Sequence, residues 1–287
     1  MDVLTALKTL EAKLSTVREQ GGSVGLVPTM GALHKGHLSL VQRALQENEA
    51  VVVSIFINPT QFNDPNDLSQ YPQTLEADVK LLKSLSHQLL VFAPTVAEMY
   101  PKGAHTKNYD FKGLDALWEG ADRPGHFKGV GTVVEKLFGL VCPQKAYFGE
   151  KDFQQLAIIR ALVSNKSLDI SIVGCPIVRE SNGLAMSSRN ERLQPEQREA
   201  AGLIYKSLLW AVKNVRDKKL PEIVLEAKKQ IETVENTSVF YFEFINATTL
   251  APIKTITDYK NTRIITAVNF HGLRLLDNIS LDPPENY

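Results

Sequence analysis

The chain has 287 residues, of which 44% are hydrophobic and 22% are charged, so it can bury the core of one large domain or two smaller ones and is not wholly disordered. Its 32 basic residues balance 32 acidic residues, and this zero net charge disfavours a general nucleic-acid binder. The two cysteines are too few for a disulfide framework, which is typical of a protein from a reducing compartment.

We expect no membrane segment in this chain. The longest apolar run, from Val51 to Ile57, is far shorter than the roughly 20 residues of a membrane-spanning helix. Charged residues interrupt the N-terminal leucines, so we expect no secretory signal. These features predict a soluble, cytoplasmic protein with no membrane partner.

Predicted helices and strands alternate through the first part of the chain. Apolar residues recur at helical spacing over residues 3–17, and Gly21 and Gly22 end that helix. Short apolar runs predict strands, and the longer segments between them predict helices. The strands are expected at 24–27, 51–57, 88–92, 145–148 and 170–178, and the helices at 34–47, 71–85 and 152–165. This alternation predicts an α/β fold with a Rossmann-like, doubly wound parallel sheet, where ligands bind outside the carboxyl ends of the strands.

The pattern changes after Pro176. Two long helical stretches, 195–216 and 221–235, precede strand-like runs at 239–246 and 263–270. We therefore expect two domains, a nucleotide-binding domain over residues 1–175 and a smaller α+β domain over residues 176–287.

Two histidines lie where the strand at 24–27 gives way to a helix, in the string PTMGALHKGH at residues 28–37. His34 and His37 are three residues apart and share a helix face. A helix N-terminus attracts anions, and Gly31 and Gly36 allow a ligand to approach the backbone closely. The string favours phosphate binding over two surface or capping histidines. Metal ligation is weaker, because no further His or Cys lies nearby in the sequence.

Polar residues also follow two later strands. Asn58 and Gln61 suit a hydroxylated carboxylate, although an ordinary Pro-containing turn explains them on their own. Lys151 can neutralise charge on a phosphate, and Gln155 lies one turn further on. Helix capping by Asp152 is the alternative interpretation of that segment.

Two further segments carry basic residues. The string Met186-Ser187-Ser188-Arg189 suits the phosphates of ATP, and the alternative is a serine cap beside a surface arginine. Residues 123–129, RPGHFKG, are predicted to form a mobile basic loop.

Together these strings resemble a known family. HxGH after a strand, with MSSR far downstream, is similar to the HIGH and KMSKS pair of the nucleotidyltransferase superfamily. The strings PTMGALHKGH, FINPTQF, YFGEKDFQQ and MSSRN resemble those of the pantoate–β-alanine ligases (pantothenate synthetases), in order along essentially the whole chain. The resemblance implies that (R)-pantoate and ATP form an enzyme-bound pantoyl adenylate with release of pyrophosphate, and that β-alanine then displaces AMP to give pantothenate. It also implies Mg²⁺ with ATP, a homodimer formed through the N-terminal domain, and a C-terminal domain that acts as a lid.

The resemblance implies roles for individual residues. His37 would be the proton donor, and His34 and Lys151 would also contact the phosphates. Gln61 would hold pantoate and border β-alanine, and Gln155 would bind pantoate. The implied ATP contacts are Met30, Gly31, Ala32, Leu33, His34, Lys35, Gly36, His37, Gly149, Glu150, Lys151, Asp152, Val178, Met186, Ser187, Ser188 and Arg189.

Several further positions carry weaker implications. Asn58 and Tyr71 are candidates near pantoate, and Arg123 and His126 match a mobile gate in similar enzymes. Where some relatives have consecutive acidic residues, this chain has Glu76-Ala77-Asp78, so a direct carboxylate ligand for magnesium is left open.

Two other functions fit the same residues. One is a different small-molecule adenylyltransferase of the superfamily, and the other is a non-catalytic sensor that binds ATP. A class I tRNA synthetase is disfavoured, because the chain is short and has no basic excess for tRNA.

Overall fold

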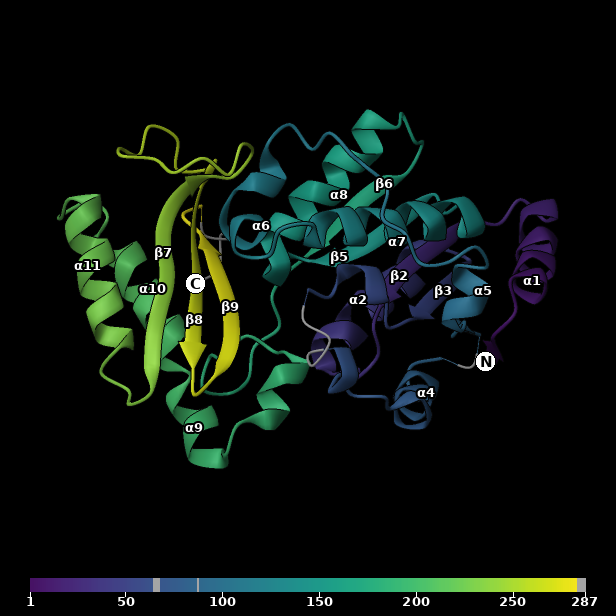
Figure 1. Cartoon of the computed structure of the whole chain (residues 1–287), viewed down its shortest axis with the longest axis horizontal. Helices are drawn as coiled ribbons and strands as arrows, with labels where there is room; N and C mark the ends of the chain where they lie inside the picture. The colour runs from purple at the N-terminus through teal and green to yellow at the C-terminus, as the bar shows by residue number, and fades with distance from the viewer. Residues whose placement is uncertain (64–67, 87, 283–287) are drawn as a thin grey trace. The chain divides into compact units, whose positions relative to one another are not determined.

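The computed structural model describes residues 1–63, 68–86 and 88–282 (Figure 1). The chain forms two compact units. The first comprises Met1–Glu150 and Gln154–Pro176, and the second comprises Lys151–Phe153 and the chain from Ile177 onward. Among the described residues, no helix has both the length and the apolar character needed to cross a membrane.

The first unit is built on a parallel sheet, whose six described strands have the order β1-β4-β3-β2-β5-β6. They are β1 (Asp2–Leu4), β2 (Val24–Thr29), β3 (Ala50–Ile55), β4 (Leu90–Phe92), β5 (Lys145–Gly149) and β6 (Ser171–Cys175). Every residue of β3 is buried, as its continuous apolar run predicted for a strand covered on both faces.

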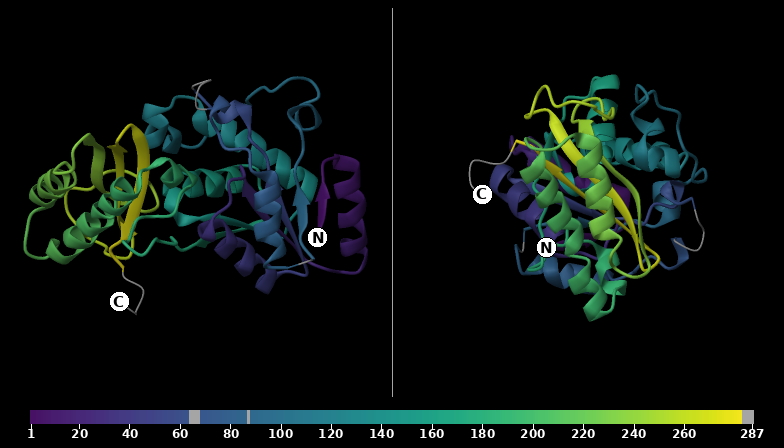
Figure 2. Two further views of the ribbon diagram at one scale, coloured as in Figure 1. Left: turned by 90° about the horizontal axis from the view of Figure 1, so that it is seen from below. Right: turned by 90° about the vertical axis from the view of Figure 1, so that its left-hand side faces the viewer.

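Helices cover both faces of this sheet (Figures 1 and 2). α1 (Leu7–Glu19), α7 (His126–Val141) and α8 (Phe153–Asn165) share a core with Leu26 and Val52. α2 (Lys35–Glu47) and α4 (Leu75–Lys83) share another with Val27 and Val53. Successive strand residues thus face opposite layers, and the predicted doubly wound α/β fold is confirmed. The short elements of this part of the chain are η1 (Pro59–Gln61), α5 (Val96–Met99), η2 (Leu114–Ala116), α6 (Trp118–Asp122) and η3 (Glu150–Asp152).

Three of the predicted elements differ from the structure in their bounds. The helix expected over 3–17 starts only at Leu7, because residues 2–4 form β1, which pairs with the edge of the sheet at β4. The mobile loop expected over 123–129 is helical from His126, where α7 begins. The helix predicted over 71–85 is confined to α4, Leu75–Lys83.

The second unit contains an antiparallel sheet of β7 (Thr237–Asn246), β8 (Thr262–Phe270) and β9 (Leu273–Ser280). α10 (Leu203–Asn214) and α11 (Leu220–Ile231) lie side by side along one face of it (Figure 2), and their apolar residues share a core with Phe242 and Val268. The remaining elements are η4 (Ser188–Arg192) and α9 (Pro195–Ala200). The helix predicted over 195–216 is therefore split in two, and β9 was not predicted.

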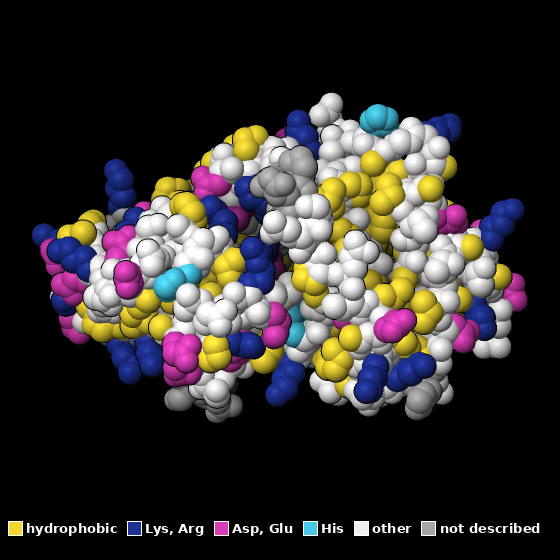
Figure 3. Space-filling view, turned by 60° about the horizontal axis from the view of Figure 1, so that its bottom comes forward, with side chains coloured by type: hydrophobic (Ala, Val, Ile, Leu, Met, Phe, Trp, Pro, Cys, Tyr) yellow, Lys and Arg dark blue, Asp and Glu magenta, His cyan; other side chains and the backbone are white. Residues whose placement is uncertain are grey.

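Charged side chains of both signs are mixed on one face of the molecule (Figure 3). On the face drawn in Figure 3, Lys and Arg alternate with Asp and Glu and do not gather into one large patch of a single sign. This distribution agrees with the zero net charge of the chain.

Candidate active site

The candidate site of the first unit lies at the carboxyl edge of its sheet. The strand order reverses between β2 and β5, which pair with each other. Ligands of open α/β sheets bind outside the carboxyl ends of the strands at such a point. Met30–His37 follows β2, Asn58–Gln61 follows β3, and Gly149 ends β5.

The turn after β2 has two successive residues in the left-handed region, Gly31 (φ 85°) and Ala32 (φ 50°). Such strain, on the order of 1–3 kcal/mol for Ala32, persists only where surrounding contacts hold it. Here the backbone N–H groups of Ala32 and Leu33 donate to the two carboxylate oxygens of Asp78, at 3.0 and 2.8 Å. At the start of the turn, the Thr29 hydroxyl accepts from Gly31 N and donates to Ser54 O.

Both histidines of the first string take part in capping α2. His34 Nδ1 accepts from Gly36 N at 3.2 Å, and His37 Nδ1 accepts from His34 N at 3.4 Å. A neutral imidazole that accepts at Nδ1 carries its proton on Nε2. The two rings lie 4.1 Å apart between centroids, so they form a pair of Nε2–H donors at a helix N-terminus. Capping and phosphate binding, set out as alternatives from the sequence, are therefore compatible.

Asn58 is buried and holds Gln61. Its Nδ2 donates to Gln61 Oε1 and to Gly129 O, both at 3.2 Å, and its Oδ1 accepts from the Tyr100 hydroxyl at 2.9 Å. Gln61 in turn donates from Nε2 to Met30 Sδ at 3.1 Å. The donor hydrogens of Asn58 are thus used within the protein, which places this residue behind the site as a support for Gln61.

α7 packs tightly against this segment. A Cβ on Gly129 would lie 2.2 Å from Thr60 O, so only glycine fits there. His126, at the start of α7, is buried, and its Nδ1 lies 2.8 Å from Gln61 O. Arg123 caps the end of α6 through its own N–H. The gate role of Arg123 and His126 stays a prediction, and the loop expected there ends where α7 begins at His126.

Two neighbouring glutamines follow β5. The Gln154 amide is buried and accepts from Glu119 N while donating to Leu114 O and Leu117 O, so it holds the segment before α6. Gln155, the predicted pantoate ligand, is half-buried.

Tyr71, the weaker candidate near pantoate, packs edge-on against Phe62, with ring centroids 5.8 Å apart.

Lys151 and its neighbours group with the second unit. Asn278 Nδ2 donates to Lys151 O at 3.0 Å, and the Arg263 guanidinium lies 4.0 Å from the centre of the Phe153 ring. The adjacent Asp277 carboxylate is buried and pairs with Arg179 through two hydrogen bonds, of 2.7 and 2.9 Å. Burial raises the pKa of Asp277, and Arg179 opposes that shift.

Val178 and the MSSR string are joined within the second unit. Met186 N donates to Val178 O at 3.0 Å, so two predicted adenine and phosphate contacts lie together. Ser187 caps η4, with its hydroxyl accepting from Arg189 N at 3.3 Å. The serine-cap interpretation is confirmed, and phosphate binding by Ser188 and Arg189 stays a prediction.

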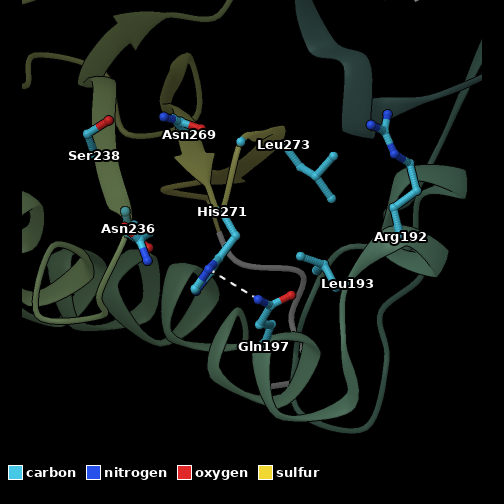
Figure 4. Close-up of a pocket in the computed structure, with 10 residues that line it drawn as sticks. Arg192, Leu193, Gln197, Asn236, Ser238, Asn269, His271 and Leu273 are labelled. Carbon is cyan, nitrogen blue, oxygen red and sulfur yellow. Dashed lines mark hydrogen bonds between the residues drawn. The ribbon is translucent and has the colours of Figure 1, made fainter.

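The second unit also bears an open pocket of about 670 Å³ (Figure 4). Its lining is mostly polar, and His271 Nδ1 lies 3.2 Å from Gln197 Nε2. Within the described part of the chain, its lining includes none of the predicted site residues. No group of three or more His, Cys, Asp or Glu residues placed to hold a metal occurs among the residues described.

Comparison with known proteins gives the family. The sequence model of the family described as pantoate-beta-alanine ligase matches residues 2–280. Pantothenate synthetase from Flavobacterium psychrophilum is 50% identical over 262 residues, which are 90% of this chain and 92% of that protein. Its counterpart from Bacteroides fragilis is 48% identical over 279 residues, which are 97% of this chain and 98% of that protein.

Solved structures agree with the sequence comparison. Pantothenate synthetase from Thermus thermophilus matches with a TM-score of 0.91 at 43% identity, covering 99% of this chain and 100% of that chain. Pantoate-beta-alanine ligase from Francisella tularensis, complexed with beta-gamma ATP and beta-alanine, matches with a TM-score of 0.79 at 33% identity, covering 99% of each chain. The chain therefore belongs to the pantoate–β-alanine ligase family.

Proposed function

We propose that this chain condenses (R)-pantoate with β-alanine to give pantothenate, with ATP converted to AMP and pyrophosphate. The observation that carries the proposal is the family match over residues 2–280. The complex of the Francisella tularensis relative with beta-gamma ATP and beta-alanine supports these two ligands for this chain.

In the first step, a pantoate carboxylate oxygen attacks the α-phosphorus of ATP. A bond forms between that oxygen and phosphorus, the bond to the bridging oxygen breaks, and pyrophosphate leaves. Both reactants are anions, so the site must supply positive charge and alignment. We assign this role to the N-terminus of α2, the Nε2–H groups of His34 and His37, and the side chains of Lys151 and Arg189. His37 donates to the departing pyrophosphate oxygen.

In the second step, the amine of β-alanine attacks the acyl carbon of the adenylate. A C–N bond forms, the C–O bond to AMP breaks, and the amine loses its proton. Adenylation is needed because an unactivated carboxylate has oxide as its leaving group. The enzyme needs no covalent intermediate of its own in this scheme.

Pantoate would be held by the amides of Gln61 and Gln155. The support for Gln61 is its fixed setting between Asn58 and Met30, which presents an amide group next to the carboxyl edge of the sheet. Gln61 would also border β-alanine.

ATP would contact the segments after β2 and β5 together with the MSSR string. Both carboxylate oxygens of Asp78 already accept the backbone N–H groups of Ala32 and Leu33, so they are engaged within the protein. Mg²⁺ would therefore arrive bound to the ATP phosphates. When bound, it would neutralise phosphate charge. We further propose that the unit from Ile177 onward is a lid that excludes water, that the enzyme is a homodimer formed through its first unit, and that it acts in the cytoplasm.

The test is a complete reaction mixture of ATP, Mg²⁺, pantoate and β-alanine, with pantothenate, AMP and pyrophosphate measured together. The proposal predicts equal amounts of all three. It predicts no pantothenate when any one substrate is omitted and, without β-alanine, pyrophosphate limited to about one per active site. Sustained pyrophosphate release in the complete mixture without an amide product would indicate another adenylyltransferase. ATP binding without turnover would indicate a sensor.

A further inference from the structure

Asp78 lies far from the histidine string in the sequence, and its carboxylate is nonetheless the acceptor for that string's backbone. It is 1% exposed, and Oδ1 and Oδ2 accept from Leu33 N and Ala32 N. The Thr74 hydroxyl supplies a third donor, at 3.3 Å from Oδ2. Both carboxylate oxygens are therefore used inside the first unit.

The backbone that Asp78 meets has the form of an anion-binding concavity. Successive N–H groups converge where neighbouring residues depart from the usual backbone regions, and such concavities bind anions in many proteins. Gly31 and Ala32 provide that geometry. A Cβ on Gly31 would lie 3.1 Å from Asp78 Oδ2, so the glycine leaves room for the carboxylate as well as for the positive φ.

The surroundings of Asp78 supply hydrogen-bond donors that match the acceptor oxygens of a carboxylate. Asp78 lies in the first turn of α4, where the helix dipole stabilises negative charge. The dipole and the three donors offset the loss of water around the buried group. An Asn at this position would present an NH₂ group to one of two backbone N–H donors.

We propose that Asp78 is a positioning residue for the site: it holds the turn after β2 as an internal anion, and it is not a magnesium ligand. The proposal rests on the proposed function in assigning the turn to the active site. Met30, at one end of the turn, contacts Gln61, and His34, at the other end, caps α2. Asp78 therefore acts on the nucleotide and pantoate segments through the backbone between them.

Magnesium ligation would require a different arrangement. Mg²⁺ needs oxygen ligands at about 2.1 Å in near-octahedral geometry. Asp78 could supply one only by releasing the amide of Ala32 or Leu33. The two roles thus predict opposite responses of these amides to the metal.

The test compares Asp78→Asn with Glu76→Gln, which removes an exposed carboxylate from the same turn of α4. We expect Asp78→Asn to speed hydrogen exchange of the Ala32 and Leu33 amides by at least about tenfold and to lower kcat by about 10–100-fold, the scale for misplaced reacting groups. The Mg²⁺ concentration for half-maximal activity should stay within about twofold of wild type, because no metal ligand is lost. Glu76→Gln should leave all three readouts unchanged.

Wild-type exchange and wild-type turnover in Asp78→Asn would overturn the proposal. A higher Mg²⁺ requirement, with activity restored by excess Mg²⁺, would also overturn it. If Asp78→Asn does not fold, the wild-type protein decides: adding Mg²⁺ should leave exchange of the two amides unchanged, and faster exchange would contradict the assignment. Amide exchange does not depend on turnover, so a wild-type protein that makes no pantothenate would refute the proposed function and leave this test intact.

Discussion

At the scale of single residues, the candidate site is characterised by which polar atoms already make hydrogen bonds within the protein. Asn58 and Asp78 direct their hydrogen-bonding groups to Gln61, Gly129 and the turn after β2. His34 and His37 accept backbone N–H groups at Nδ1, which makes Nε2 the donor of each neutral ring. The buried amide and carboxylate thus hold neighbouring segments of the chain, and phosphate binding is the role that we propose for the two imidazoles.

His37→Ala and Lys151→Ala should each slow adenylate formation by about 10²–10³-fold, the scale for losing one donor to the transition state. Single-turnover pyrophosphate release measures this step. His105→Ala is a suitable control, because His105 is exposed on a loop and belongs to none of the proposed site segments. Rates for His37→Ala and Lys151→Ala within about threefold of wild type would refute the assigned roles.

The sequence identifies some of these residues and misses others for a physical reason. His34, His37 and Lys151 stand beside predicted strand ends, where local pattern and family resemblance both point to phosphate binding. Asp78 and Asn278 act on backbone groups that lie 45 and 127 residues away. Only the folded chain brings such partners together, so no local pattern indicates them.

At the scale of elements, the contact between α7 and η1 sets the position of Gln61. Gly129→Ala places a Cβ 2.2 Å from Thr60 O and should destabilise the protein by about 1–3 kcal/mol, with a raised KM for pantoate. Gly139→Ala on the same helix meets no atom within 4 Å and should stabilise the protein by about 0.4–1 kcal/mol. Urea denaturation and pantoate kinetics check both variants, and equal effects of the two would contradict this account of the packing.

A pH effect arises where α2 meets β5. The Arg43 guanidinium, followed by Lys145, lowers the pKa of Glu47 to about 2. Because the folded state favours the ionised carboxylate, its small stabilising effect is present above the unfolded pKa of 4.5 and is lost as the pH falls towards 2. Urea titrations near neutral pH should give the wild type a larger free energy of unfolding than Glu47→Gln. This difference should vanish in acid. A difference that grows in acid would contradict the ion pairing.

Strongly patterned elements of the fold could be predicted, and ambiguous ones could not. The continuous run of β-branched residues in β3 predicts a buried strand, and the structure confirms this prediction. Val3 and Leu4 fit the spacing of the following helix, yet they join the sheet edge through pairing with Val91 and Phe92. The segment 123–129 resembles a loop in the sequence, yet α7 begins at His126, and close packing against Thr60 is what requires Gly129 within that helix.

At the scale of the whole molecule, the segment Lys151–Phe153 groups with the unit that contains the MSSR string. Lys151 and Arg189, the two cations that we assign to the phosphates, therefore belong to the same unit. The proposed homodimer belongs to this scale too, and sedimentation equilibrium should give twice the mass of the chain. A monomer at assay concentrations would contradict that part of the proposal.

The most direct test of the central claim is pyrophosphate release from ATP and Mg²⁺ with pantoate, measured with and without β-alanine. We predict a burst of about one pyrophosphate per active site without β-alanine, because the adenylate stays bound. Adding β-alanine should convert the burst into steady turnover with pantothenate formation. No pantoate-dependent pyrophosphate under either condition would contradict the ligase function.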